Sequence, residues 1–148
     1  MMDEIDKKIL RRLQQNARVT ISVLSQEISL SMPAISERLK KLEAAGVIQR
    51  YTAILNPALV DKHLMALIFL SFDNPANGDK FRDFVADVAD IKECFYITGN
   101  YDYTIKVITK NTKSLERLLT HIKEQPGVVK TETIVILSTI TERPSITI

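Results

Sequence analysis

Several features that mark other protein classes are scarce or missing in this 148-residue chain. It has a single cysteine, Cys94, so no disulfide can form within the chain and no cysteine-rich zinc site can be built. Four glycines and five prolines exclude collagen-like and low-complexity proteins. The longest purely apolar run, residues 64–70, is far short of the roughly 20 residues that cross a bilayer, and the acidic N-terminal residues do not resemble a secretory signal. We therefore expect a disulfide-free cytoplasmic protein with no membrane partner.

Catalytic signatures are missing as well. The sequence contains no glycine-rich phosphate loop, no HExxH zinc motif and no serine nucleophile elbow. His63 and His121 have no third ligand at zinc spacing. Cys94 has no neighbouring base to activate it, so we expect a small buried apolar side chain rather than a nucleophile. An enzyme is therefore the least favoured class, and we expect no catalytic residues, no metal and no tightly bound cofactor.

The charge is small but unevenly distributed. The net charge is +2, with 45% hydrophobic and 26% charged residues, as in an ordinary globular chain. Residues 1–60 hold nine Lys and Arg against six Asp and Glu, whereas residues 61–148 hold eleven against twelve. This asymmetry is a weak indication of an anionic partner for the N-terminal part.

Helical periodicity dominates the first third of the chain. Apolar stripes predict helices over about residues 4–16, 21–28 and 31–45, the last ending at Gly46. A short helix, a turn of about three residues and a longer helix make a helix-turn-helix. Residues 47–55 are rich in β-forming residues, so we expect strand structure there, and a strand pair after the third helix would make the domain a winged helix-turn-helix.

The third predicted helix has one apolar and one polar face. Ile35, Leu39 and Leu42 cluster on the inner face. The outer face suits base edges near its N-terminus and phosphates further along. The residues that we predict to contact double-stranded DNA are Ser31, Pro33, Ser36, Glu37, Arg38, Lys40 and Lys41, with Arg50 on the wing.

Three alternatives stay open from the residues alone. The helices could form a bundle whose lysines are merely solvated. Glu37, which repels phosphate, could accept from cytosine or pair with Lys41 one turn on. The basic residues of the first helix suit either the DNA backbone or a solvated face: Lys7, Lys8, Arg11 and Arg12.

From residue 63 the pattern becomes strand, helix, strand, twice over. Strands are expected over residues 63–72, 91–98, 103–108 and 128–137, and helices near 81–88 and 115–122. This order predicts an α+β chain whose second domain is a ferredoxin-like βαββαβ sandwich with both helices on one face of an antiparallel sheet. We assign residues 1–58 to the first domain, 59–62 to a linker and 63–148 to the second. The other sheet face, with Ile108, is too apolar to stay wet, which favours a homodimer through this domain.

Several segments carry a resemblance to a known family, and they run in order over nearly the whole chain. They are Asp3-x-Ile5-Asp6-x-x-Ile9-Leu10, Asn16-x-Arg18, Leu24-Ser25-x-x-Ile28-x-Leu30-Ser31, Arg38-Leu39-x-x-Leu42-Glu43-x-x-Gly46-Val47-Ile48, Tyr51-x-Ala53-x-Leu55-Asn56, Glu93-Cys94, Thr98-Gly99-Asn100-Tyr101-Asp102-Tyr103 and Pro126-Gly127-Val128. The chain resembles the leucine-responsive regulatory protein/AsnC family of prokaryotic transcription regulators. The resemblance implies a winged helix-turn-helix, an ACT-like βαββαβ domain, assembly of dimers into rings such as a tetramer of dimers, and a cytoplasmic, nucleoid-associated protein.

The resemblance also implies a site for an amino acid or similar small effector. The turn Gly99, Asn100, Tyr101 and Asp102 matches the family's effector motif, in which glycine permits close approach and Asp102 can pair with an α-ammonium group. Thr131 and Thr133 match positions that complete such pockets. The alternative is a plain turn whose aspartate bonds to nearby backbone. Many members have an acidic residue in place of Asn100, so the ligand's identity stays open.

Two functions follow, in order of preference. The first is a sequence-specific DNA-binding transcription regulator tuned by an amino-acid effector. The second is an architectural protein that coats DNA with little sequence preference. The operator, the target genes, and activation or repression are not encoded in any motif of the sequence.

Overall fold

The computed structural model describes residues 2–148, and their contacts group into two units. One unit holds the chain up to Ile54 together with Thr141–Ile148; the other is Leu55–Ile140. The expected second domain, 63–148, therefore differs from the observed unit at both ends. The last eight residues group with the first unit because their main chain binds its first helix.

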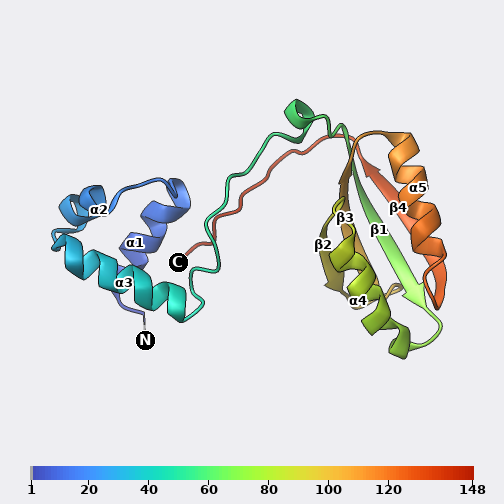
Figure 1. Ribbon diagram of the computed structural model, residues 1–148, viewed down its shortest axis with the longest axis horizontal. Coiled ribbons are helices and arrows are strands. Elements are labelled where there is room, and N and C mark those ends of the chain that lie inside the picture. Colours follow the sequence, from blue (N-terminus) through green and yellow to red (C-terminus); the bar gives the residue numbers. More distant parts are fainter. Residues whose placement is uncertain (1) are drawn as a thin grey trace. The chain divides into compact units, whose positions relative to one another are not determined.

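Three helices form the first unit: α1 (Glu4–Gln15), α2 (Ile21–Ile28) and α3 (Met32–Ala44) (Figure 1). Each begins where a side chain accepts from an otherwise unpaired amide. Asp3 forms a capping box with Asp6 at α1, Thr20 caps α2, and Ser31 caps α3. These are the three predicted helices, with ends shifted by a residue or so.

A small apolar core holds the three helices together. One fully buried side chain from each helix lies at its centre: Ile9, Leu24 and Ile35. The turn between α2 and α3 begins at Ser29, which adopts a left-handed conformation with φ 59°. The short turn and the shared core give the helix-turn-helix that the spacing predicts.

The predicted strand over residues 47–55 does not form. No residue of this segment is assigned to a strand in the structure, and most of its side chains are exposed, with Ile54 at 65%. Beyond Gly46, at φ +69°, the Val47 and Ile48 amides bond back to the Leu42 carbonyl. A segment rich in β-forming residues becomes a strand only when a partner pairs with it, and no ladder pairing includes this one in the part of the chain that the structure describes.

The second unit is the predicted βαββαβ sandwich. Its elements are β1 (Leu64–Phe72), α4 (Gly78–Asp87), β2 (Ile91–Tyr96), β3 (Tyr103–Thr109), α5 (Thr112–Lys123) and β4 (Val128–Ile136), with short 3-10 turns η1 (Pro57–Val60) and η2 (Pro75–Asn77). The sheet order is β2-β3-β1-β4, and every neighbouring pair is antiparallel. Figure 1 shows both α4 and α5 against one face of this sheet.

The two sheet faces differ in burial. Ala66, Ile68 and Leu70 of β1 are fully buried in the core that Phe81 of α4 and Leu118 of α5 share. The alternate β1 side chains, Met65, Leu67 and Phe69, are only half-buried and lie outside that core. Side chains of a strand alternate between faces, so the second set faces away from the helices, on what we call the open face.

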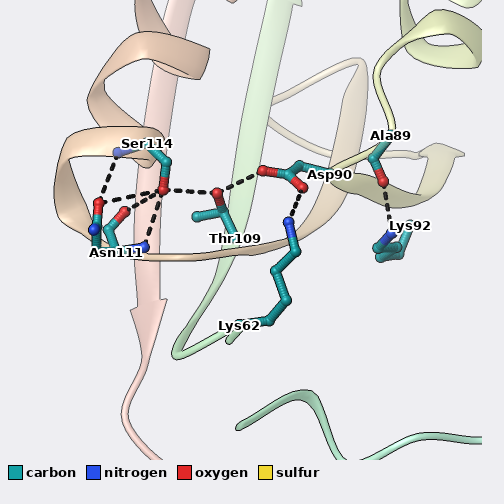
Figure 2. Close-up of polar contacts among 7 residues, drawn as sticks. All are labelled: Lys62, Ala89, Asp90, Lys92, Thr109, Asn111 and Ser114. Carbon is teal, nitrogen blue, oxygen red and sulfur yellow. Dashed lines mark hydrogen bonds and ion pairs between the residues drawn. The ribbon is translucent and has the colours of Figure 1, made fainter. Parts of the chain in front are cut away.

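A polar network ties the helix connections to one end of the sheet (Figure 2). Thr109, fully buried, donates to Asp90 Oδ2 at 2.6 Å, and its oxygen lies 2.8 Å from Ser114 Oγ. Lys62 Nζ lies 2.6 Å from Asp90 Oδ1, and Asn111 caps α5 through Ser114. The buried hydroxyl is therefore satisfied, as a buried polar group must be if it is not to destabilise the fold.

Among the described residues, none of the helices combines the length and the apolar content that a bilayer crossing needs.

Replacing Asp90 by Asn should lower stability at neutral pH but not in acid. Burial alone would raise the pKa of Asp90, but the hydrogen bonds from Lys62 and Thr109 outweigh it and hold the pKa below its ordinary value. The ionised carboxylate therefore stabilises the fold above its unfolded-state pKa, and this contribution is lost as the pH falls through the lower folded-state pKa. We expect a loss of about 1 kcal/mol at pH 7, measured by denaturant unfolding, that shrinks toward zero in acid. Asp87→Asn, which changes an exposed carboxylate of α4, is the control. An equal loss of stability at pH 7 and in acid would contradict the role given to the ionised Asp90 carboxylate.

Candidate nucleic-acid and effector interfaces

The outer face of α3 presents the short polar and basic side chains predicted for it. Ser31, Pro33, Glu37 and Lys40 are exposed, and Ser36 is half-buried. Ser31 caps the helix by accepting from the Ala34 amide at 3.3 Å. Ile35 and Leu42 are buried on the opposite side, so the orientation of α3 follows from its own amphipathic pattern.

Glu37 and Lys41 pair with each other. Lys41 Nζ lies 2.7 Å from Glu37 Oε1, and both side chains are about 70% exposed. The hydrogen bond from Lys41 lowers the pKa of Glu37. Of the two alternatives for Glu37, the intrahelical pair is the one seen in the free protein. An exposed pair of this kind is worth little, so it can open when a phosphate approaches Lys41.

Arg38 is engaged within the unit rather than free. Its Nη1 lies 2.8 Å from Asp3 Oδ2 and 2.7 Å from Asp6 Oδ1. These two carboxylates form the capping box of α1. The Asp6 amide and, after it, the Arg38 guanidinium hold the pKa of Asp3 below its ordinary value. The guanidinium therefore links α3 to the start of α1, with its charge already compensated.

The basic residues of α1 are mostly engaged too. Lys7 pairs with Glu4 at 2.5 Å, and Arg12 pairs with Glu27 of α2 at 2.5 Å. Arg11 binds main chain near the end of the chain. Arg50 is exposed in the segment that follows α3, although the wing strand expected to carry it is not formed.

The turn between β2 and β3 is tied to the end of β1. Gly99 has φ +114°, a conformation that side chains disfavour. The Asp102 amide donates to the Leu70 carbonyl, and the Phe72 amide donates to Asp102 Oδ2, both at 2.8 Å. One carboxylate oxygen of Asp102 therefore holds the turn against the end of β1, through a residue 30 positions away rather than through the nearby backbone expected of a plain turn.

Tyr101 extends from this turn across the open face. Its ring lies 5.5 Å from that of Phe69, Lys130 Nζ lies 4.7 Å above it, and its hydroxyl donates to Glu132. No sequence pattern indicates that Phe69, Lys130 and Glu132 lie beside Tyr101, because their proximity follows from the pairing of Phe69 with Glu132 between β1 and β4. The alternation of residue types along β4 indicates that Lys130 and Glu132 share one face, but only the register of β4 with β1 places them beside Phe69.

Thr131 and Thr133 lie on the other face from Tyr101. They pair with Leu70 and Ile68, which face the helices. Both threonines are half-buried on the edge strand β4. Within one chain the predicted effector residues therefore divide into the turn, the open face and the helix side.

The remaining singled-out residues show no reactive environment. Cys94 packs against the sheet core, and burial raises the pKa of its thiol, which disfavours the nucleophilic thiolate. His63 lies 3.3 Å from Asp61 at an exposed position, and His121 is exposed on α5. Among residues 2–148, no three His, Cys, Asp or Glu side chains are arranged to hold a metal ion.

Comparison with known proteins assigns both units. Residues 2–49 match the model of a winged helix-turn-helix DNA-binding domain, and residues 64–146 match that of the Lrp/AsnC ligand binding domain. The HTH-type transcriptional regulator FL11 of Pyrococcus horikoshii is 33% identical over 141 residues, covering 93% of this chain and 91% of its own. The leucine-responsive regulatory protein of Haemophilus influenzae is 34% identical over 139 residues, covering 92% and 84%.

Solved structures agree with this assignment. A transcriptional regulator from Neisseria meningitidis in complex with L-Met has a TM-score of 0.93 at 30% identity, covering 99% of this chain and 97% of its own. The feast or famine regulatory protein of M. tuberculosis complexed with L-methionine has a TM-score of 0.91 at 28% identity, covering 98% of both chains. The predicted family and fold class are thereby confirmed, and the chain belongs to the Lrp/AsnC family of DNA-binding transcription regulators.

Proposed function

We propose that this protein binds duplex DNA through α3 and adjusts that binding in response to an amino acid held by the second unit. The observation that carries the DNA part is the exposed face of α3, whose inner side is fixed by buried Ile35. A helix exposed in this way fits the major groove, with small side chains at base edges and lysines at phosphates.

The proposed contacts divide by chemistry. Ser31, Pro33, Ser36 and Glu37 lie in the N-terminal half of α3 or at its cap, which is the part that reads base edges in helix-turn-helix proteins. Lys40, Lys41 and Arg50 supply charge for phosphates. Arg38, paired with Asp3 and Asp6, is proposed to orient α3 rather than to touch phosphate.

An amino acid is the proposed effector, and L-methionine is the first to test because the two solved relatives hold it. The turn Gly99, Asn100, Tyr101 and Asp102 would supply backbone access and a carboxylate for the α-ammonium group. Thr131 and Thr133 would supply hydroxyls. Because these residues divide between faces of one chain, we infer that a second copy completes the pocket.

A homodimer through the open face is proposed as the basic assembly. Leu67 and Ile108 are half-buried without belonging to the core, and Phe95 and Ile134 are 53% and 47% exposed. An apolar surface of this kind is typical of an interface between copies. Four dimers would make the ring expected of the family, and we place the protein in the cytoplasm, associated with the nucleoid.

Replacing Lys40 and Lys41 together by Ala should flatten the salt dependence of DNA binding. Each lost phosphate contact reduces the slope of log K against log salt by about 0.9, so we expect a change of about 1.8 for each half-site bound, measured by fluorescence anisotropy over a salt series. Lys113→Ala with Lys123→Ala on α5 removes the same charge outside the interface and serves as the control. An unchanged slope would remove both lysines from the phosphate contacts.

L-Methionine should raise the melting midpoint of the wild-type protein. A ligand that binds only the folded state stabilises by about 2.7 kcal/mol at a hundredfold excess over Kd, and dye-reported melting measures the shift. The double variant Thr131→Val, Thr133→Val keeps the β-branched shape and should abolish the shift, while Thr139→Val, exposed beyond β4, should keep it. If none of the twenty amino acids moves the wild-type midpoint, the effector proposal fails.

Leu67→Lys should dissociate the dimer. A lysine at the centre of the open face would bury an unpaired charge in the interface, so sedimentation equilibrium should give the mass of one chain. Glu116→Lys, exposed on α5 against the other face, should leave the dimer intact. Dimers of the Leu67 variant as tight as those of the wild type would contradict this interface.

A further inference from the structure

The exposed side of α1 binds the main chain of the C-terminal segment, residues 141–148. Arg11 donates through Nε and Nη2 to the main-chain oxygen of Ile148, at 2.9 and 2.6 Å. One turn along the helix, Gln14 donates to the Ile146 carbonyl at 3.1 Å and accepts from the Ile146 amide at 2.5 Å. Figure 1 shows the C-terminal end of the chain beside α1.

All of these bonds go to backbone atoms. The Gln14 amide exchanges two hydrogen bonds with one residue, as a paired residue does in an antiparallel ladder. The Ile146 side chain remains 75% exposed, so it contributes little to the contact. The Arg11 and Gln14 side chains therefore bind main-chain atoms, and those atoms belong to the chain's own C-terminal segment.

This contact changes how the two units are connected. The chain leaves the first unit after Ile54 and returns to it after Ile140, shortly after β4 ends at Ile136. A single flexible linker leaves a domain free to reorient, whereas a second attachment shortens the range that it can explore. The returning segment starts from the strand that carries Thr131 and Thr133.

We propose that residues 141–148 are a reversible second tether of the DNA-binding unit, docked on Arg11 and Gln14 of α1. While docked, the tether restricts the orientation of α3, so that a protein binding two half-sites loses less orientational freedom. Few exposed hydrogen bonds hold the segment, so it releases easily, and a change in β4 reaches α1 through the chain itself. This inference deepens the proposed function and rests on it for its effect on DNA.

The docking itself is tested without DNA, by hydrogen exchange of the full chain. The Ile146 amide should exchange about tenfold more slowly than an unstructured amide, because Gln14 accepts its hydrogen. Gln14→Ala should abolish this protection while the amide of the core residue Ile9 stays protected, which shows that the helices remain folded. Gln15→Ala is the matched control, because that side chain contacts Arg12 instead. An unprotected Ile146 amide in the wild type would overturn the proposal.

The tether's effect is tested on duplexes with one or two half-sites. Gln14→Ala should weaken binding to two half-sites about fivefold, because the second half-site is then bound at a lower effective concentration. Binding to a single half-site should be unchanged. The salt dependence should also be unchanged, because Gln14 is uncharged. Equal affinities of Gln14→Ala and Gln15→Ala for two half-sites would overturn the tether. Failure of the wild type to bind either duplex would instead contradict the proposed function.

Mixing two forms of the chain tests whether the docked segment belongs to the same chain as α1 or to another copy. A labelled chain ending at Ile140 has a vacant α1 site, and its Gln14 side-chain signal should not respond to unlabelled full-length protein. A return of that signal to its full-length position would mean that the segment docks between copies, and would overturn attachment within one chain.

Discussion

Three side chains decide which surface the first unit presents. Ile9, Leu24 and Ile35, one from each helix, are completely buried against each other. Since α3 has only one apolar stripe, burying Ile35 leaves the opposite side outward. The ion pairs of Arg38 with Asp3 and Asp6 add a second, polar attachment at the start of α1. The surface that we propose to bind DNA is therefore a consequence of a very small core, supported at its margin by ion pairs.

The second unit depends on a similar division within one strand. β1 pairs with β3 on one side and β4 on the other, so it lies in the middle of the sheet. Its alternate residues supply the helix-covered core and the open face, and the backbone at its end holds Asp102. A ligand at the β2–β3 turn would thus contact residues that are hydrogen-bonded to β1, the strand whose alternate side chains form part of the open face. This gives a physical route from effector to assembly, because a ligand acts only by favouring one arrangement over another.

Local signals predicted most of the fold, and contacts between distant residues account for what they missed. Helix ends were predictable because caps such as Thr20 and Ser31 act within three residues of the helix start. Residues 47–55 had strand composition but no partner, and composition does not encode pairing. The contact between Tyr101 and Glu132 needed the register of β1 with β4. Arg38 had the charge of a phosphate ligand, and nothing local indicated that Asp3 and Asp6 would engage it.

We propose that α3 is the element that enters the duplex. Backbone amide shifts of the labelled protein, recorded during titration with operator DNA and with a random duplex of equal length, test it most directly. If α3 enters the duplex, the largest operator-specific changes should fall between Ser31 and Lys41, while the amides of the sheet should respond only where assembly changes. Changes concentrated in β2 or β4, with Ser36 and Lys40 unmoved, would contradict it.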